Sequence, residues 1–292
     1  MYKRFFAFGC SFTEYRWATW ADIVAYAYKD AEYYNFGKAG GSNQVILSRV
    51  MEADEQYHFN KDDLVIVQWT GPNRECRWLN GGWRGAGGNI YLFGSQFPKE
   101  FIDNWTHPLD FILKDMVAMK SVNTLLKASG CTYYNITMAP IRSPDYYPIK
   151  APDKKDDIQL LIENYKQITS QIKTSISEIV FKNGDWLSKL PRPKSAFGPW
   201  ENMKVKADSH PTTNEYLEYL KTEMPEITLP PDADAIADSI TQTVLNQINH
   251  EKDLPLGSMF GERPAPIRAR DTIFFYQRYK QVLPEQIAAN VH

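Results

Sequence analysis

A serine close to the start of the chain stands where a reactive residue could meet a substrate. Ser11 lies in the segment GCSFT at residues 9–13, directly after the apolar run FFAF at residues 5–8. Such a run predicts a buried strand, and reacting groups in open α/β sheets gather at the carboxyl ends of the strands. Ser11 is therefore a candidate nucleophile, although a hydroxyl that caps a following helix would have the same local pattern.

Residues that could support a nucleophilic serine follow in order along the chain. Gly40 lies in a glycine-rich segment, where backbone N–H groups can face a small ligand. Asn73 comes shortly after the strongly apolar run at residues 63–69, which predicts another buried strand. Asp208 and His210 precede a helical stretch. A serine, backbone and amide donors and an Asp–His pair are the groups that acyl transfer needs.

Each of these residues also has an ordinary structural explanation. Gly40 could belong to a simple turn, and Asn73 could form an Asx turn after a proline. His210 could be no more than the flank of the next helix. Cys10 is a rival nucleophile, but neighbouring side chains in extended backbone point in opposite directions, which favours a small buried residue there.

Taken together and in this order, the motifs resemble those of the SGNH (GDSL-type) hydrolases. The family's first block, Gly-Asp-Ser-x-Thr/Ser, is similar to residues 9–13. The asparagine and glycine of its second block match Asn35 and Gly40, and the Gly-x-Asn-Asp of its third block matches residues 71–74 except at the last position. The fifth block, Asp-x-x-His-Pro, is approached by residues 208–211. The resemblance spans roughly residues 1–225.

The resemblance implies a fold and a set of roles. The fold would be a three-layer α/β/α, flavodoxin-like arrangement around a mostly parallel sheet. Ser11 would be the nucleophile, His210 the general base and Asp208 the carboxylate that orients it. The N–H groups of Ser11 and Gly40 and the side chain of Asn73 would form the oxyanion hole. No metal or cofactor is implied.

Three positions depart from the family pattern. Cys10 replaces an aspartate that is not the nucleophile. Arg74 replaces the aspartate that ends the third block and could bind an anionic group of the substrate. Asp208 and His210 are one residue closer together than usual, so a backbone carbonyl could orient His210 instead.

A stretch rich in Trp, Arg and Gly follows the third block and predicts a loop. Sugar faces stack on aromatic rings, and the guanidinium of arginine can bind hydroxyls or carboxylates. We therefore expect substrate-binding residues here, namely Arg74, Trp78, Trp83 and Arg84, with a self-packed Ω-type loop as the alternative.

The predicted function is removal of acetyl or another small acyl group from a carbohydrate. Acyl transfer onto a sugar, or a catalytically silent binding or assembly module, are the alternatives.

Composition limits the partners of the protein. The 292 residues include 33 basic and 35 acidic side chains, a net charge of −2, so nothing indicates binding to nucleic acid or to an anionic membrane surface. The 3 cysteines do not provide an even disulfide framework. No apolar run approaches the roughly 20 residues that span a bilayer. We expect a soluble, cytoplasmic protein without a cleaved leader.

The resemblance implies a catalytic domain over residues 1–225. The remaining residues, 226–292, are expected to form a helical C-terminal extension, which could form an oligomer or assembly contact. The helices and strands expected after the third block are a helix at 109–129, a strand at 131–138, one long helix at 156–181, a closing helix at 216–224 and further helices at 233–248 and 272–283.

Overall fold

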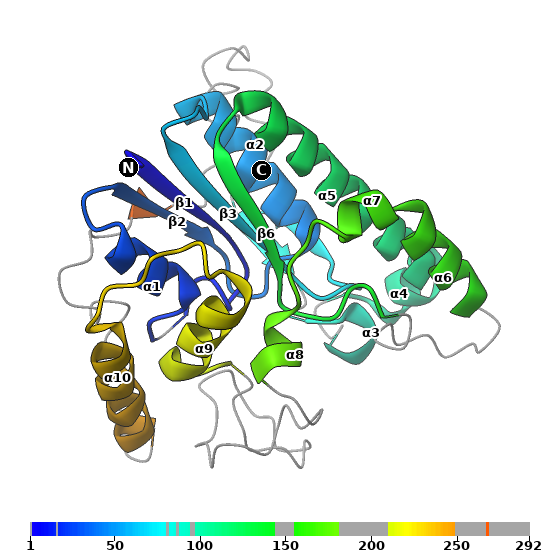
Figure 1. Ribbon diagram of the computed structural model, residues 1–292. Helices are drawn as coiled ribbons and strands as arrows, with labels where there is room; N and C mark the ends of the chain where they lie inside the picture. Colours follow the sequence, from blue (N-terminus) through cyan, green and yellow to red (C-terminus); the bar gives the residue numbers. More distant parts are fainter. Residues whose placement is uncertain are drawn as a thin grey trace, which may run out of the picture.

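The computed structural model describes residues 2–15, 17–79, 82–85, 88–93, 97–143, 155–180, 210–248 and 267–268. A five-stranded sheet lies at its centre, with helices on both faces (Figure 1). The strands are β1 (Arg4–Gly9), β2 (Glu32–Gly37), β3 (Asp63–Trp69), β6 (Thr132–Thr137) and β7 (Ile267–Arg268), in the order β6-β3-β1-β2-β7. All of these pairs are parallel, which confirms the predicted α/β fold with a mostly parallel sheet.

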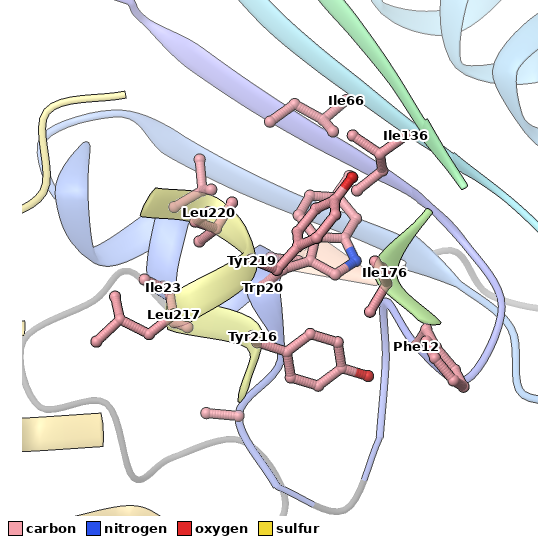
Figure 2. Packing of buried hydrophobic residues seen from close by; sticks show 14 of the residues in the cluster. Phe12, Trp20, Ile23, Ile66, Ile136, Ile176, Tyr216, Leu217, Tyr219 and Leu220 are labelled. Atoms are coloured by element: carbon pink, nitrogen blue, oxygen red, sulfur yellow. The ribbon is translucent and has the colours of Figure 1, made fainter. Parts of the chain in front are cut away.

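Strand alternation divides the core into two layers. In β1 the buried side chains of Phe5 and Ala7 face one side of the sheet, and those of Phe6 and Phe8 face the other. The first side is covered by α1 (Trp20–Ala27), α8 (Ile176–Val180), α9 (Thr213–Glu223) and α10 (Ala233–Ile248). The second is covered by α2 (Asn43–Tyr57), α5 (Pro108–Ser129) and α6 (Lys155–Asn164). Figure 2 shows part of the first layer, a cluster in which Leu217 and Leu220 of α9 lie together with Ile66 of β3 and Ile136 of β6.

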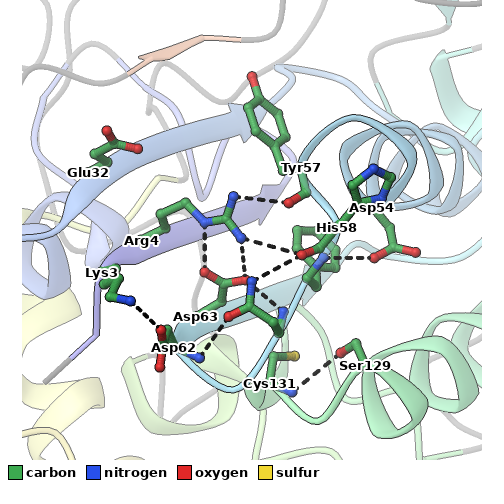
Figure 3. Close-up of polar contacts among 12 residues, drawn as sticks. Lys3, Arg4, Glu32, Asp54, Tyr57, His58, Asp62, Asp63, Ser129 and Cys131 are labelled. Atoms are coloured by element: carbon green, nitrogen blue, oxygen red, sulfur yellow. Dashed lines mark hydrogen bonds and ion pairs between the residues drawn. The ribbon is translucent and has the colours of Figure 1, made fainter.

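The register between β1 and β3 is held at their amino ends by ion pairs (Figure 3). The Arg4 guanidinium donates Nε to Asp63 Oδ1 and Nη2 to Asp63 Oδ2, both at 2.7 Å. The two residues are also paired in the strand register. Arg4 Nη1 further donates to the Tyr57 carbonyl at 3.0 Å, at the end of α2. Bidentate arginine–carboxylate pairs specify geometry strongly, so this cluster aligns the strands and thereby their carboxyl ends, where Ser11 lies.

Most predicted elements are confirmed. The strands at 5–8, 63–69 and 131–138 and the helices at 109–129, 216–224 and 233–248 are present within a few residues of the expected bounds. The helix α5 ends at Gly130, which adopts a left-handed φ of 74°. The two-residue strand β7 was not predicted, and the helix predicted at 272–283 lies outside the described residues.

The single long helix predicted at 156–181 is wrong. The structure has α6, then α7 (Lys166–Thr169), then α8, with extended chain between α7 and α8. There Ile172 forms a parallel bridge to Asn135, and the Asn135 carbonyl accepts a hydrogen bond from Lys173 N at 2.9 Å. The free edge of β6 provides hydrogen-bonding partners that a continuous helix would have left unused, and amphipathic spacing alone could not reveal this.

Candidate active site

Ser11 lies in a tight turn at the carboxyl end of β1. The Cys10 carbonyl accepts hydrogen bonds from Thr13 N and Glu14 N at 3.0 and 3.2 Å, so the chain turns as soon as the strand ends. Gly9 makes this possible, because a Cβ there would overlap Thr13 Oγ1 and lie 2.7 Å from Gln68 Oε1. Ser11 itself is 8% exposed.

The turn is tied to β3 by the buried side chain of Gln68, which sequence reasoning missed. Gln68 Oε1 accepts hydrogen bonds from Cys10 N at 3.3 Å and Thr13 Oγ1 at 3.1 Å. Cys10 Sγ also contacts Gln68 Oε1, at 3.4 Å, and Cys10 is fully buried. The Cys10 thiol therefore points into the core. A polar residue directly after the apolar run Leu64–Val67 was the signal that could have identified Gln68.

His210 contacts Ser11 although the two residues lie far apart in the sequence. The distance between His210 Nε2 and Ser11 Oγ is 2.7 Å, across 199 positions of sequence. His210 is positioned by the start of α9, where Thr212 accepts a hydrogen bond from Glu215 N and Glu215 reciprocates in a capping box. Asp208 lies outside the described residues, so the choice between Asp208 and a backbone carbonyl as the group that orients His210 stays a prediction.

The two other residues expected at the oxyanion hole both have left-handed backbone. Gly40 has a φ of 72° and Asn73 a φ of 60°. They follow β2 and β3, the two neighbours of β1, so both lie at the carboxyl edge that carries Ser11. Asn73 is fully buried, and within the described part of the chain neither polar atom of its carboxamide has a hydrogen-bond partner.

The burial and the backbone conformation of Asn73 both have a free-energy cost. A buried polar group without a partner costs about 1–3 kcal/mol. Left-handed backbone at a residue other than glycine adds to this cost, although asparagine tolerates it better than most. Native structures keep such features mainly where they serve a function.

A polar cluster beside this edge was not predicted. Asn43, at the start of α2, accepts a hydrogen bond from Thr70 N at 2.8 Å and donates Nδ2 to Thr70 O at 3.2 Å. Asp115 of α5 interacts with Asn43. Burial raises the pKa of Asp115 to about 8, while the interaction with Asn43 and the positive charge of Arg74 oppose that rise. The cluster holds the segment that leads to Asn73.

Arg74 joins the ends of two other strands in this region. Its Nη1 donates to the Gly41 carbonyl at 3.5 Å, and its Nη2 lies 3.6 Å from Met138 Sδ. Met138 Sδ is in turn 3.8 Å from Cys10 Sγ, next to Ser11. The half-buried Arg74 guanidinium thus lies between the glycine-rich segment after β2 and the end of β6.

The Trp/Arg/Gly stretch forms a β-hairpin, and the loop predicted there is wrong. Strands β4 (Cys76–Leu79) and β5 (Gly82–Gly85) are antiparallel, with Trp78 opposite Trp83 and Arg77 opposite Arg84. The glycines serve the hairpin, because a Cβ at Gly85 would overlap Cys76 Sγ. The signal for a hairpin was the alternation of Cys76 and Trp78 with Arg77 and Leu79, and of Trp83 with Arg84, which the neighbouring glycines made hard to recognise.

The hairpin is attached to the glycine-rich segment after β2. Cys76 Sγ donates to the Gly40 carbonyl at 3.6 Å. Trp78 and Trp83 lie on the same hairpin face as Cys76, and their rings meet edge to face at 5.7 Å. Arg84 is exposed on the opposite face. The structure therefore brings the tryptophan pair towards the Gly40 segment and separates Arg84 from it.

The part of the chain that the structure describes contains neither a metal-binding cluster nor a membrane-spanning helix. Within those residues no group of three or more His, Cys, Asp or Glu side chains is placed to hold a metal ion. Over the same residues, none of the helices combines the length and the apolar character that a membrane crossing requires.

No protein-family model matches the chain, and no curated protein matches it significantly. Several solved structures are distantly similar. A Veillonella parvula DSM 2008 member of the lipolytic protein G-D-S-L family is 11% identical with a TM-score of 0.39, covering 75% of this chain and 97% of that one.

Two further solved structures have comparable scores. A Bacteroides fragilis NCTC 9343 protein assigned provisionally as an acylhydrolase is 15% identical, with a TM-score of 0.36 and coverage of 84% and 87%. The YxiM protein of Bacillus subtilis is 12% identical, with a TM-score of 0.37, covering 85% of this chain and 57% of that one. Similarity at this level is distant, so the chemistry of the site is inferred from its own residues.

Proposed function

We propose that the chain is a serine ester hydrolase of SGNH type, which acts through an acyl-enzyme. The observation that carries the proposal is the 2.7 Å contact between Ser11 Oγ and His210 Nε2 at the carboxyl edge of a parallel sheet. A nucleophile needs an adjacent base within hydrogen-bond reach, and this pair meets that requirement.

The proposed reaction proceeds in two halves. His210 Nε2 accepts the hydroxyl proton of Ser11 while Ser11 Oγ bonds to the ester carbonyl carbon, and the carbonyl oxygen becomes an oxyanion. The tetrahedral intermediate then collapses, the bond to the alcohol breaks, and the alcohol takes the proton from His210. Water attacks the acyl-enzyme in the same way, with His210 again as base, and releases the acid and free Ser11.

Oxyanion stabilisation is assigned to the N–H groups of Ser11 and Gly40 and to the Asn73 carboxamide. Support comes from the unpartnered, buried amide of Asn73 and from the left-handed backbone at Asn73 and Gly40. Donors that are already held in place stabilise a developing negative charge without reorganising, and this is often the largest single contribution to the rate.

For the substrate we propose an ester of a carbohydrate with acetyl or another small acyl group. The tryptophan pair of the hairpin, on the face that carries Cys76 and its contact to Gly40, offers aromatic rings for a sugar to stack on. The half-buried Arg74 guanidinium, whose contacts to the Gly41 carbonyl and Met138 Sδ are 3.5 and 3.6 Å long, would bind an anionic substituent of the same substrate.

A fluorophosphonate probe tests the identity of the nucleophile. Wild type and Cys10→Ala should both take the label, detected as the added mass of the intact protein, because the buried Cys10 thiol points into the core. Ser11→Ala should take none. Labelling that is lost in Cys10→Ala and kept in Ser11→Ala would overturn the assignment, and a folded wild type that never labels would favour a silent binding module.

A second test concerns the hairpin. Trp78→Ala should raise KM for an acetylated oligosaccharide about 3–10-fold, since an aromatic contact is worth roughly 0.5–1.5 kcal/mol. Its kcat/KM for p-nitrophenyl acetate, which lacks a sugar, should not change.

The matched control is Trp105→Ala, because Trp105 is 76% exposed on α4 (Lys99–Trp105), outside the hairpin, and should affect neither substrate. Equal losses of kcat/KM on both substrates in Trp78→Ala would contradict the sugar-binding role of Trp78.

The products formed in the presence of an added acceptor sugar distinguish hydrolysis, which releases the free acid, from acyl transfer, which acylates the acceptor.

A further inference from the structure

The imidazole of His210 lies flat against an aromatic ring. The ring centroids of His210 and Tyr15 are 3.7 Å apart with an interplanar angle of 14°, which is a face-to-face stack. Phe12, between the nucleophile and Tyr15 in sequence, flanks the imidazole at 5.3 Å and 51°. Both aromatic residues are buried, with Tyr15 8% and Phe12 3% exposed, so neither ring is free to move aside.

Trp17 holds both partners of this stack. Its ring packs edge to face on Tyr15, at a centroid distance of 4.5 Å and an angle of 88°. Its indole Nε1 donates a 2.7 Å hydrogen bond to the carbonyl of Pro211, the residue directly after His210. Trp17 is 2% exposed. One buried side chain therefore fixes the ring that faces His210 and also the backbone that carries His210.

The stack limits the motion that would separate His210 from Ser11. Rotation of the imidazole about its Cβ–Cγ bond moves Nε2 out of line with Ser11 Oγ, and a ring packed flat against one face opposes that rotation. An aromatic face also attracts a cation. The imidazole becomes an imidazolium when it takes the Ser11 proton, so the attraction is stronger in the transition state than in the resting enzyme.

We propose that Tyr15, supported by Trp17, is a positioning residue that sets the plane of the His210 imidazole and stabilises its protonated form. The proposal rests on the proposed hydrolase function. The face of the Tyr15 ring thus orients the His210 imidazole in part. The group that accepts a hydrogen bond from His210 Nδ1 orients it as well. The hydroxyl of Tyr15 is not required for this role.

Kinetics of the full-length chain with p-nitrophenyl acetate test the proposal. Tyr15→Leu should lower kcat about 10–100-fold with less than a twofold change in KM, because the lost interaction is strongest in the transition state. Tyr15→Phe should keep kcat within about twofold of wild type, because the ring face remains. Trp17→Phe, which keeps an aromatic ring and removes the bond to Pro211, should lower kcat about 3–10-fold.

The matched control is Tyr34→Leu. Tyr34 is also buried and stacked, on Phe6 at 4.5 Å, but on the other face of the sheet, away from His210. Its replacement should cost stability and leave kcat unchanged when measured well below the melting temperature.

The outcomes separate this proposal from the function on which it rests. An inactive wild type would contradict the hydrolase function itself. With an active wild type, a folded Tyr15→Leu of unchanged kcat would overturn the positioning role, as would a Tyr15→Phe that loses as much as Tyr15→Leu. If Tyr15→Leu does not fold, Trp17→Phe decides, and a folded Trp17→Phe with unchanged kcat overturns the proposal.

Discussion

Ser11→Ala and His210→Ala should each lower kcat for ester hydrolysis by about 10⁴–10⁶-fold, and the double variant should lower it no further. The two reacting atoms are 2.7 Å apart and would act as one unit, so removing either leaves the other without a role. The residual rate of all three variants should reflect the oxyanion donors and substrate binding alone. Steady-state kinetics with p-nitrophenyl acetate would measure it.

His58→Asn is the matched control for the loss of an imidazole. His58 lies at the opposite, amino-terminal edge of the sheet, and asparagine tolerates its left-handed φ of 51°. This variant should keep the wild-type kcat. Losses from Ser11→Ala and His210→Ala that multiply in the double variant would mean that the two residues act independently, and the proposed proton transfer between them would be wrong.

Asn73→Gly should lower kcat about 10²–10³-fold with little change in KM, the usual result of removing one oxyanion donor. Its free energy of unfolding should stay within about 1 kcal/mol of wild type, because glycine adopts positive φ freely and no buried amide is left without a partner. Kinetics and urea unfolding of the same preparation would measure the two quantities.

Asn73→Ala separates the catalytic loss from backbone strain. It should lose as much kcat as Asn73→Gly, but it should be less stable than Asn73→Gly by roughly 1–2 kcal/mol, because alanine is strained at a φ of 60°. Full kcat in Asn73→Gly together with a clear loss of stability would make Asn73 a structural turn residue and exclude it from the oxyanion hole.

Local patterns in the sequence were enough to predict the strands β1, β3 and β6 and to select most of the candidate residues. The runs Phe5–Phe8 and Leu64–Val67 at the centres of β1 and β3 are continuously apolar because parallel strands are buried on both faces. Gly9, Gly40 and Asn73 could be chosen because a residue type that tolerates a tight turn, placed just after a predicted strand, is information contained in a few neighbouring residues.

Contacts between distant segments could not be predicted in this way. Gln68 and Asn43 were missed because the meaning of a buried amide depends on partners, such as Cys10 and Thr70, that only the fold brings near. The helix predicted over residues 156–181 failed for the same reason, since the free edge of β6 competes for the backbone of residues 172–173 and does not appear in helical spacing.

The sequence by itself determined which residue types are available for chemistry and where the chain must turn to present them. Propensity and hydrophobic periodicity act over a few residues, and they were sufficient to locate the turns and the candidate residues beside them. Only the tertiary structure decided that His210 meets Ser11 and that Tyr15 stacks on its imidazole. These contacts depend on how α9 docks against the segment after β1, and that docking is set by packing across the whole first core layer.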